Sequence, residues 1–125
     1  MTVITQSANL GDLLKYEAPM YHYSRDTILV ATGQNLSLGT VVGIQTADGN
    51  AYALDPAASD GTETAAGVLL YAVDATSADM SGVIVARHAI VSVSALVWPV
   101  GITNNQKLAA LAQLKSIGII SRTGA

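Results

Sequence analysis

The sequence predicts a compact, mostly β domain with one principal α-helix, and three observations support this prediction. Short runs rich in Val, Ile and Thr alternate with turn residues from Thr27 onward. One segment, near residues 104–117, combines helical spacing with start and stop signals. The length of 125 residues suits a single domain with a continuous core.

The first segment, Met1 to Gly11, is polar or small and shows neither a helical nor a strand period. Such a segment has no apolar face of its own to bury. Fully extended, it could reach about 35 to 40 Å. The residues alone leave two interpretations open, a frayed terminus or an arm that becomes ordered on a partner.

The predicted strands share β-branched or alternating apolar residues and are bounded by turn formers. The run 66–73 is apolar on both faces, so it should be a central, buried strand, whereas the run 89–97 alternates apolar residues with Ser and should bury one face. The predicted strands are Thr27–Ala31, Thr40–Ile44, Ala51–Leu54, Ala66–Val73, Gly82–Ala86, Ala89–Val97 and Ile119–Ser121.

Glycines and polar clusters mark the connections between these strands. Asp48-Gly49 predicts a tight hairpin, and Thr32 to Asn35 predicts a turn. Gly39 and Gly43 bracket a strand, which indicates a bulge or the close passage of another backbone segment. The stretch 55–64 should be a long polar loop.

The predicted helix has a capping box at its start, because Thr103 is followed three residues later by Gln106. Gly118 is suited to close it as the residue just past its C-terminus. Its apolar residues spread over about half of the circumference, which is wider than a single contact requires, so packing on two sides is expected.

No residue constellation for catalysis or metal binding stands out. His22 and His88 are far apart and lack an adjacent nucleophile or acidic partner, and the chain has no cysteine. The loop aspartates lie beside turn formers, where short carboxylates bond local backbone amides; they are Asp48, Asp55, Asp60, Asp74 and Asp79. We therefore expect no catalytic residues, no metal and no cofactor.

Composition limits the partners. Half of the residues are apolar and 12% are charged, which suggests that other copies cover part of the surface. The net charge is -3 and the six Lys and Arg residues are scattered, so nucleic acid is not expected as a partner. No leader-type or membrane-spanning apolar run is found, so we expect synthesis in the cytoplasm and no membrane contact.

The pair Trp98-Pro99 is the most distinctive dipeptide of the chain. A lone Trp at the end of an apolar strand can bury a large area, and the following Pro stops the pairing of the strand. We expect this pair to act as an anchor of the core or of a trimer contact.

Several segments along the chain form a distinctive ordered set, with Trp-Pro shortly before the closing helix and strand. They are GDLLKYE at 11–17, YSR at 23–25, GTVVG at 39–43, DPAASDG at 55–61, AGVL at 66–69, LVWPVGI at 96–102 and LKSIGIISR at 114–122. This ordered set resembles the head decoration protein D family of tailed bacteriophages, and the resemblance covers nearly the whole chain.

The resemblance implies a compact β-clip-like (β-tulip) domain over residues 15–125 and an extended capsid-binding arm over residues 1–14. It implies a homotrimer that binds the major capsid protein at threefold and quasi-threefold sites on the outer surface of the expanded virion head, in the role of a cement protein against the pressure of packaged DNA. The arm would add a strand to the capsid protein. Its implied contact residues are Thr2, Val3, Ile4, Thr5, Gln6, Ser7, Ala8, Asn9, Leu10, Leu13 and Leu14.

A second hypothesis starts from the tyrosines, which can serve as stacking platforms for small molecules or glycans. They are Tyr16, Tyr21, Tyr23, Tyr52 and Tyr71. A specific ligand combined with indifference to capsids would favour this small-molecule or glycan-binding β-domain over a structural protein.

Overall fold

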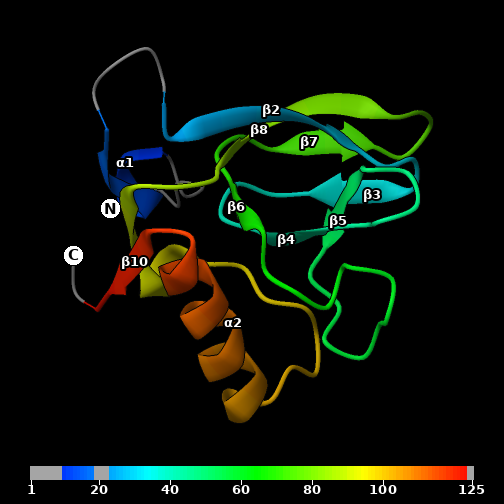
Figure 1. Cartoon of the computed structure of the whole chain (residues 1–125). Coiled ribbons are helices and arrows are strands. Elements are labelled where there is room, and N and C mark those ends of the chain that lie inside the picture. Colours follow the sequence, from blue (N-terminus) through cyan, green and yellow to red (C-terminus); the bar gives the residue numbers. More distant parts are fainter. Residues whose placement is uncertain (1–9, 19–22, 124–125) are drawn as a thin grey trace, which may run out of the picture.

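The computed structural model describes residues 10–18 and 23–123, and the fold is mostly β, as the sequence predicts. A barrel lies on one side of the molecule, and a small sheet with the long helix lies on the other (Figure 1). Within the described residues, neither helix is long and apolar enough to cross a membrane. The finer β-clip assignment stays a prediction.

Five of the described strands close into a barrel in the order β2-β5-β4-β6-β8. Their neighbours pair antiparallel, except that β2 and β5 meet in a short parallel bridge between Val30 and Ala51. Strands β3 and β7 form a separate antiparallel ribbon. The bounds are β2 Arg25–Val30, β3 Gln34–Leu36, β4 Val41–Ile44, β5 Ala51–Ala53, β6 Gly67–Leu69, β7 Val73–Ala75 and β8 Met80–Val85.

The second sheet has the order β1-β9-β10, with β1 antiparallel and β10 parallel to β9. Strand β1 follows a one-turn helix, α1, and β10 follows the long helix α2. The bounds are α1 Leu10–Leu13, β1 Leu14–Glu17, β9 Ala89–Ser92, α2 Asn104–Ser116 and β10 Ile119–Arg122.

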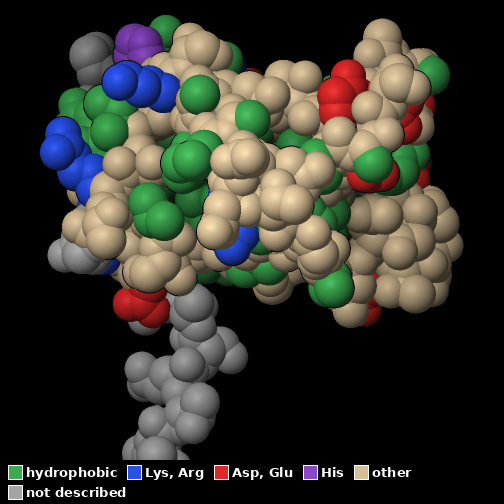
Figure 2. Space-filling view, turned by 90° about the horizontal axis from the view of Figure 1, so that it is seen from below, with side chains coloured by type: hydrophobic (Ala, Val, Ile, Leu, Met, Phe, Trp, Pro, Cys, Tyr) green, Lys and Arg blue, Asp and Glu red, His purple; other side chains and the backbone are tan. Residues whose placement is uncertain are grey.

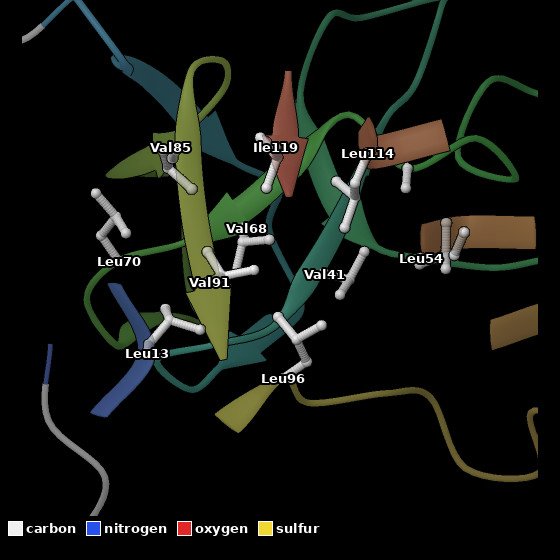
Figure 3. Close-up of a cluster of buried hydrophobic side chains, with 13 residues drawn as sticks. Leu13, Val41, Leu54, Val68, Leu70, Val85, Val91, Leu96, Leu114 and Ile119 are labelled. Atoms are coloured by element: carbon white, nitrogen blue, oxygen red, sulfur yellow. The ribbon is translucent and has the colours of Figure 1, made fainter. Parts of the chain in front are cut away.

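Two buried clusters hold these parts together. One fills the barrel and includes Val30, Val42, Leu69 and Ile84. The other joins the barrel to the second sheet and α2 (Figure 3). Its members are small or aliphatic, as the composition predicts, and include Leu13, Val41, Leu54, Val68, Leu70, Val85, Val91, Leu96, Leu114 and Ile119.

The close backbone approach predicted at the strand glycines is confirmed. A Cβ atom at Gly39 would collide with the carbonyl oxygen of Ala95, and one at Gly43 would lie 2.6 Å from the backbone of Thr62. The predicted hairpin is also confirmed, because β4 and β5 pair antiparallel and Gly49 has a φ of 71°. The predicted turn at 32–35 is shorter than expected, since β3 already begins at Gln34.

The prediction of one continuous strand over Ala66–Val73 is wrong. Strand β6 ends at Leu69, and β7 begins at Val73 in the separate ribbon. The run is apolar on both faces because β6 separates the two clusters, with Leu69 in the barrel cluster and Val68 in the other. Tyr71 lies at the bend between the strands and is exposed.

The prediction of a strand over Ala89–Val97 is also wrong beyond Ser92. Residues Val93–Ala95 form a short 3₁₀ helix, closed by a hydrogen bond from Leu96 N to Val93 O. The chain then leaves the second sheet, and Val97 bonds to backbone groups of Gly39 and Val41 beside the barrel. The alternation of apolar residues and Ser therefore continues past Ser92 in the sequence, although the strand itself ends there.

The helix is confirmed with its signals. Thr103 Oγ1 accepts from Gln106 N, the Gln106 side chain accepts from Thr103 N, and Gly118 has a φ of 87°. Ala110 and Leu114 of α2 are buried, Leu111 packs against the same cluster, and Gln113 bonds the backbone of Ala65. The expected packing does not extend to Leu108, which is 64% exposed, so that side of α2 is open.

Candidate functional site

The chain that leads out of the N-terminal segment is fixed firmly to the body. Leu13 is fully buried in the cluster under the second sheet, and Leu10 and Leu14 pack against the same cluster. Strand β1 pairs with β9, and Lys15 Nζ donates to Gly11 O at 2.7 Å. The segment before Leu10 therefore starts from a fixed point at the edge of a sheet.

This finding changes the limits of the arm. The family resemblance implies that Leu13 is a contact residue of the arm, but the side chain of Leu13 is part of the core and cannot contact a partner while the domain is folded. Leu10 and Leu14 are likewise partly committed to packing. The remaining residues assigned to the arm, Thr2 to Asn9, lie outside the described residues.

An ion pair ties strand β1 to the barrel. Arg25 on β2 donates to both carboxylate oxygens of Glu17 on β1, at 2.8 and 2.7 Å, and both side chains are largely shielded from solvent. Arg25 also donates to the hydroxyl of Tyr71 at 3.2 Å. The hydrogen bond to Glu17 raises the pKa of Arg25 above its ordinary value, so the two-pronged pair stays charged.

Two further contacts fix the end of β1 and the start of β2. The buried Ser24 accepts from Ala18 N at 2.9 Å and donates to His88 O at 3.0 Å. Arg87 donates to Asp26 and to Tyr23 O, each at 2.6 Å. The second sheet and the barrel are therefore linked by polar contacts as well as by the shared core.

The Trp-Pro pair lies where the chain turns toward α2. Trp98 is half-buried and packs against the cluster of Figure 3 without entering it fully. Pro99 opens a tight turn in which Ile102 N donates to Pro99 O at 3.3 Å and Gly101 has a φ of 82°. This turn leaves Val100 fully exposed. A role of the pair at a contact between copies stays a prediction.

The described titratable residues mostly serve the local structure. Four loop aspartates accept from the amide two residues further on, as predicted; they are Asp48, Asp55, Asp60 and Asp74. Asp79 is different, because it accepts from the amide and hydroxyl of Thr32, on another loop. These contacts lower the pKa of Asp60 to about 2, chiefly through the Thr62 hydroxyl, and also lower the pKa of Asp79.

The histidine and the tyrosines do not assemble into one site within the described residues. His88 packs edge-on against Tyr23 with ring centroids 5.0 Å apart, beside an open depression of about 630 Å³ that Arg87 and Lys115 also line. Tyr71 bonds Arg25, and Tyr52 bonds Asp48 on a different turn. His22 and Tyr21 lie outside the described residues. Among the described residues, no group of three acidic or histidine side chains could hold a metal ion.

The described chain thus has a β-rich body, a first described segment that is anchored in the core, and exposed apolar residues on and beside the long helix. The comparison with known families agrees, because the family model described as Bacteriophage lambda head decoration protein D matches residues 3–119. The chain therefore belongs to this family of structural proteins of the phage head, whose place is the capsid of the virion. A search of curated proteins finds no match.

Proposed function

We propose that this chain binds the outer surface of the expanded phage head as a trimer at threefold and quasi-threefold sites, with the major capsid protein as its partner. In this role it stabilises the shell against the pressure of packaged DNA. The observation that carries the proposal is the fixed base of the N-terminal segment, where Leu13 is buried and β1 is paired and ion-paired to the barrel.

The contact residues of the proposed arm are Thr2 to Asn9, which precede this base. An extended segment can add a strand to the edge of a capsid-protein sheet, where main-chain hydrogen bonds give affinity that depends little on side chains. A rigid base favours such binding because the base itself loses no conformational freedom when the arm binds. Leu13 and β1 would thus aim the arm without contacting the capsid.

Trimerisation would raise the overall binding affinity even if each arm binds the capsid weakly. Three arms held by one trimer bind neighbouring capsid subunits together, and linked binding of this kind can exceed the single affinity by about 10² to 10⁴-fold. The gain comes without any single strong contact. Such distributed binding across subunit boundaries is what resistance to an outward pressure requires.

Electron microscopy of phage heads tests this function. Heads that lack the protein are compared with the same heads after addition of the purified chain. We expect added density on the outer surface at threefold and quasi-threefold positions, and expect the decorated heads to release less DNA on heating. Density elsewhere on the particle, or none at all, would refute the proposed site of binding.

A further inference from the structure

The solvent-facing side of α2 carries a ridge that nothing in the described chain covers. Leu108 is 64% exposed, and the exposed Ala112 and Lys115 follow at spacings of four and three residues, so the three side chains lie along one side of the helix. For the Lys115 ammonium group, no hydrogen bond or ion pair is found among the described residues. An apolar residue and an unpaired cation thus lie about 10 Å apart along the helix.

A groove lies on the neighbouring side of the same helix, between α2 and the loop 55–64. Its volume is about 270 Å³, and it is lined by Leu54, Pro56, Glu63, Ala109, Ala110 and Gln113 among others. Its wall is fixed, because Gln113 Oε1 accepts from Ala65 N at 2.8 Å. The lining is aliphatic apart from amide groups and one carboxylate, Glu63.

Ridge and groove complement one another in charge and in length. The ridge carries a cation at Lys115, and the groove carries an anion at Glu63. The ridge spans 108–115 and the helical wall of the groove spans 106–113, so each covers the same length of helix. Figure 2 shows the face on which α2 projects, with exposed hydrophobic side chains spread across it and most of the visible Lys and Arg at the opposite end from most Asp and Glu.

We propose that the ridge of one copy docks into the groove of the next copy, with Leu108 in the aliphatic part and Lys115 beside Glu63. Because ridge and groove are different surfaces of one molecule, the contact is head-to-tail, and three such contacts can close into a ring. This inference rests on the trimer in the proposed function and names the surface that builds it. It also explains why the side of α2 that carries Leu108 is open in a single copy.

The first test is Leu108→Glu in the full-length chain, with Leu29→Glu as the matched control. Leu29 is an exposed leucine of 45% accessibility on the barrel strand β2. Sedimentation equilibrium should show a trimer for the unchanged chain and for L29E, and at least about tenfold weaker assembly for L108E. A trimer that survives L108E, or is lost in L29E, would overturn the proposed surface. An unchanged chain that is monomeric would overturn the surface and the trimer together.

The second test exchanges the charges. Lys115→Glu and Glu63→Lys should each weaken assembly, and the double variant should recover most of it, since the attraction is restored in the reverse sense. A double variant no better than either single one would overturn the pairing of Lys115 with Glu63.

Binding to heads that lack the protein separates this inference from the proposed function. If L108E stays trimeric but no longer binds heads, the ridge contacts the capsid and the self-contact is overturned, while decoration itself stands. If L108E becomes monomeric and binds heads more weakly, the surface is supported and so is the role of linked arms.

Discussion

The barrel differs from the helix–sheet half in what its surface leaves unpaired. We define the helix–sheet half as α1, β1, β9, α2 and β10. Closure of the barrel leaves its strands no free edge, and its turns bond their own aspartates. The helix–sheet half has edge strands in β1 and β10, an exposed Leu108 on α2, and an unpaired Lys115 among the described residues. The difference teaches that the barrel satisfies its strand edges by closure, whereas the helix–sheet half leaves two strand edges and the outer side of α2 open to a partner.

Truncation of the buried Leu13 side chain tests whether this residue belongs to the folded core or to the arm. Of the substitutions described here, it should lower the free energy of unfolding most. Leu13→Ala should lower the free energy of unfolding by about 2 to 5 kcal/mol, because it opens a cavity in a packed cluster. Urea denaturation measures this loss. Unchanged stability together with lost capsid binding would instead return Leu13 to the arm and contradict its place in the core.

Addition of a methyl group at Gly43, in a strand of the barrel, should cause the next largest loss of stability. Gly43→Ala places a Cβ atom 2.6 Å from the backbone of Thr62, which cannot withdraw as a flexible side chain could. We expect a loss of about 1 to 3 kcal/mol in the free energy of unfolding. Thermal denaturation provides the measurement.

Gly49→Ala is the matched control for the barrel substitution. A Cβ atom added at Gly49 would meet no other atom within 4 Å, but the residue has a φ of 71°. Its substitution should therefore cost about 1 kcal/mol from backbone strain alone. Equal losses for the two variants would contradict the close approach of strand β4 and the loop at Thr62.

Loss of the helix cap should cost less. Thr103→Ala removes the acceptor for Gln106 N, so the free energy of unfolding should fall by about 1 kcal/mol. Thr103→Ser keeps the hydroxyl and should retain most of the stability. Because α2 carries the proposed ridge, T103A should also weaken assembly slightly, as measured by sedimentation. Stronger assembly of T103A would contradict this prediction.

The smallest expected effect is a loss of stability in acid, through the protonation of Asp60 in a turn beside the barrel. The pKa of Asp60 is lowered from 3.8 to about 2, so its hydrogen bonds with Thr62 stabilise the fold fully above the ordinary pKa. That contribution is lost as the pH falls from about 4 through about 2. The stability difference between the unchanged chain and Asp60→Asn should shrink over this range. A difference that grows on acidification would contradict the assignment.

Local signals predicted the parts of the fold that local chemistry decides. Thr103, Gln106 and Gly118 define the helix because a cap acts within one turn, and Asp48-Gly49 defines a hairpin for the same reason. The breaks at Tyr71 and Val93 could not be predicted from the pattern. At Tyr71 the chain passes from the barrel to the separate ribbon, and at Val93 it leaves the second sheet, and both changes depend on packing between distant segments.

The candidate site was predictable in outline, and its limits were not. The composition of the first residues is compatible with a frayed terminus or an arm, and only the family resemblance favours the arm. Leu13 looks like any other apolar residue at the end of this segment. Its burial depends on β9 and the turn after it, far along the chain. The groove beside Glu63 likewise depends on the packing of α2 beside the loop 55–64. The exposure of Leu108 was equally hidden, since helical spacing alone does not say which apolar residues a single copy leaves open.

The account depends most on an arm that binds while the body only holds it. A chain truncated to residues 10–125 keeps Leu10, Leu13 and all of β1, so its fold and assembly should match those of the full chain. Its binding to purified expanded heads that lack the protein, measured by co-sedimentation, should be lost. Full decoration of the heads by the truncated chain would contradict the account.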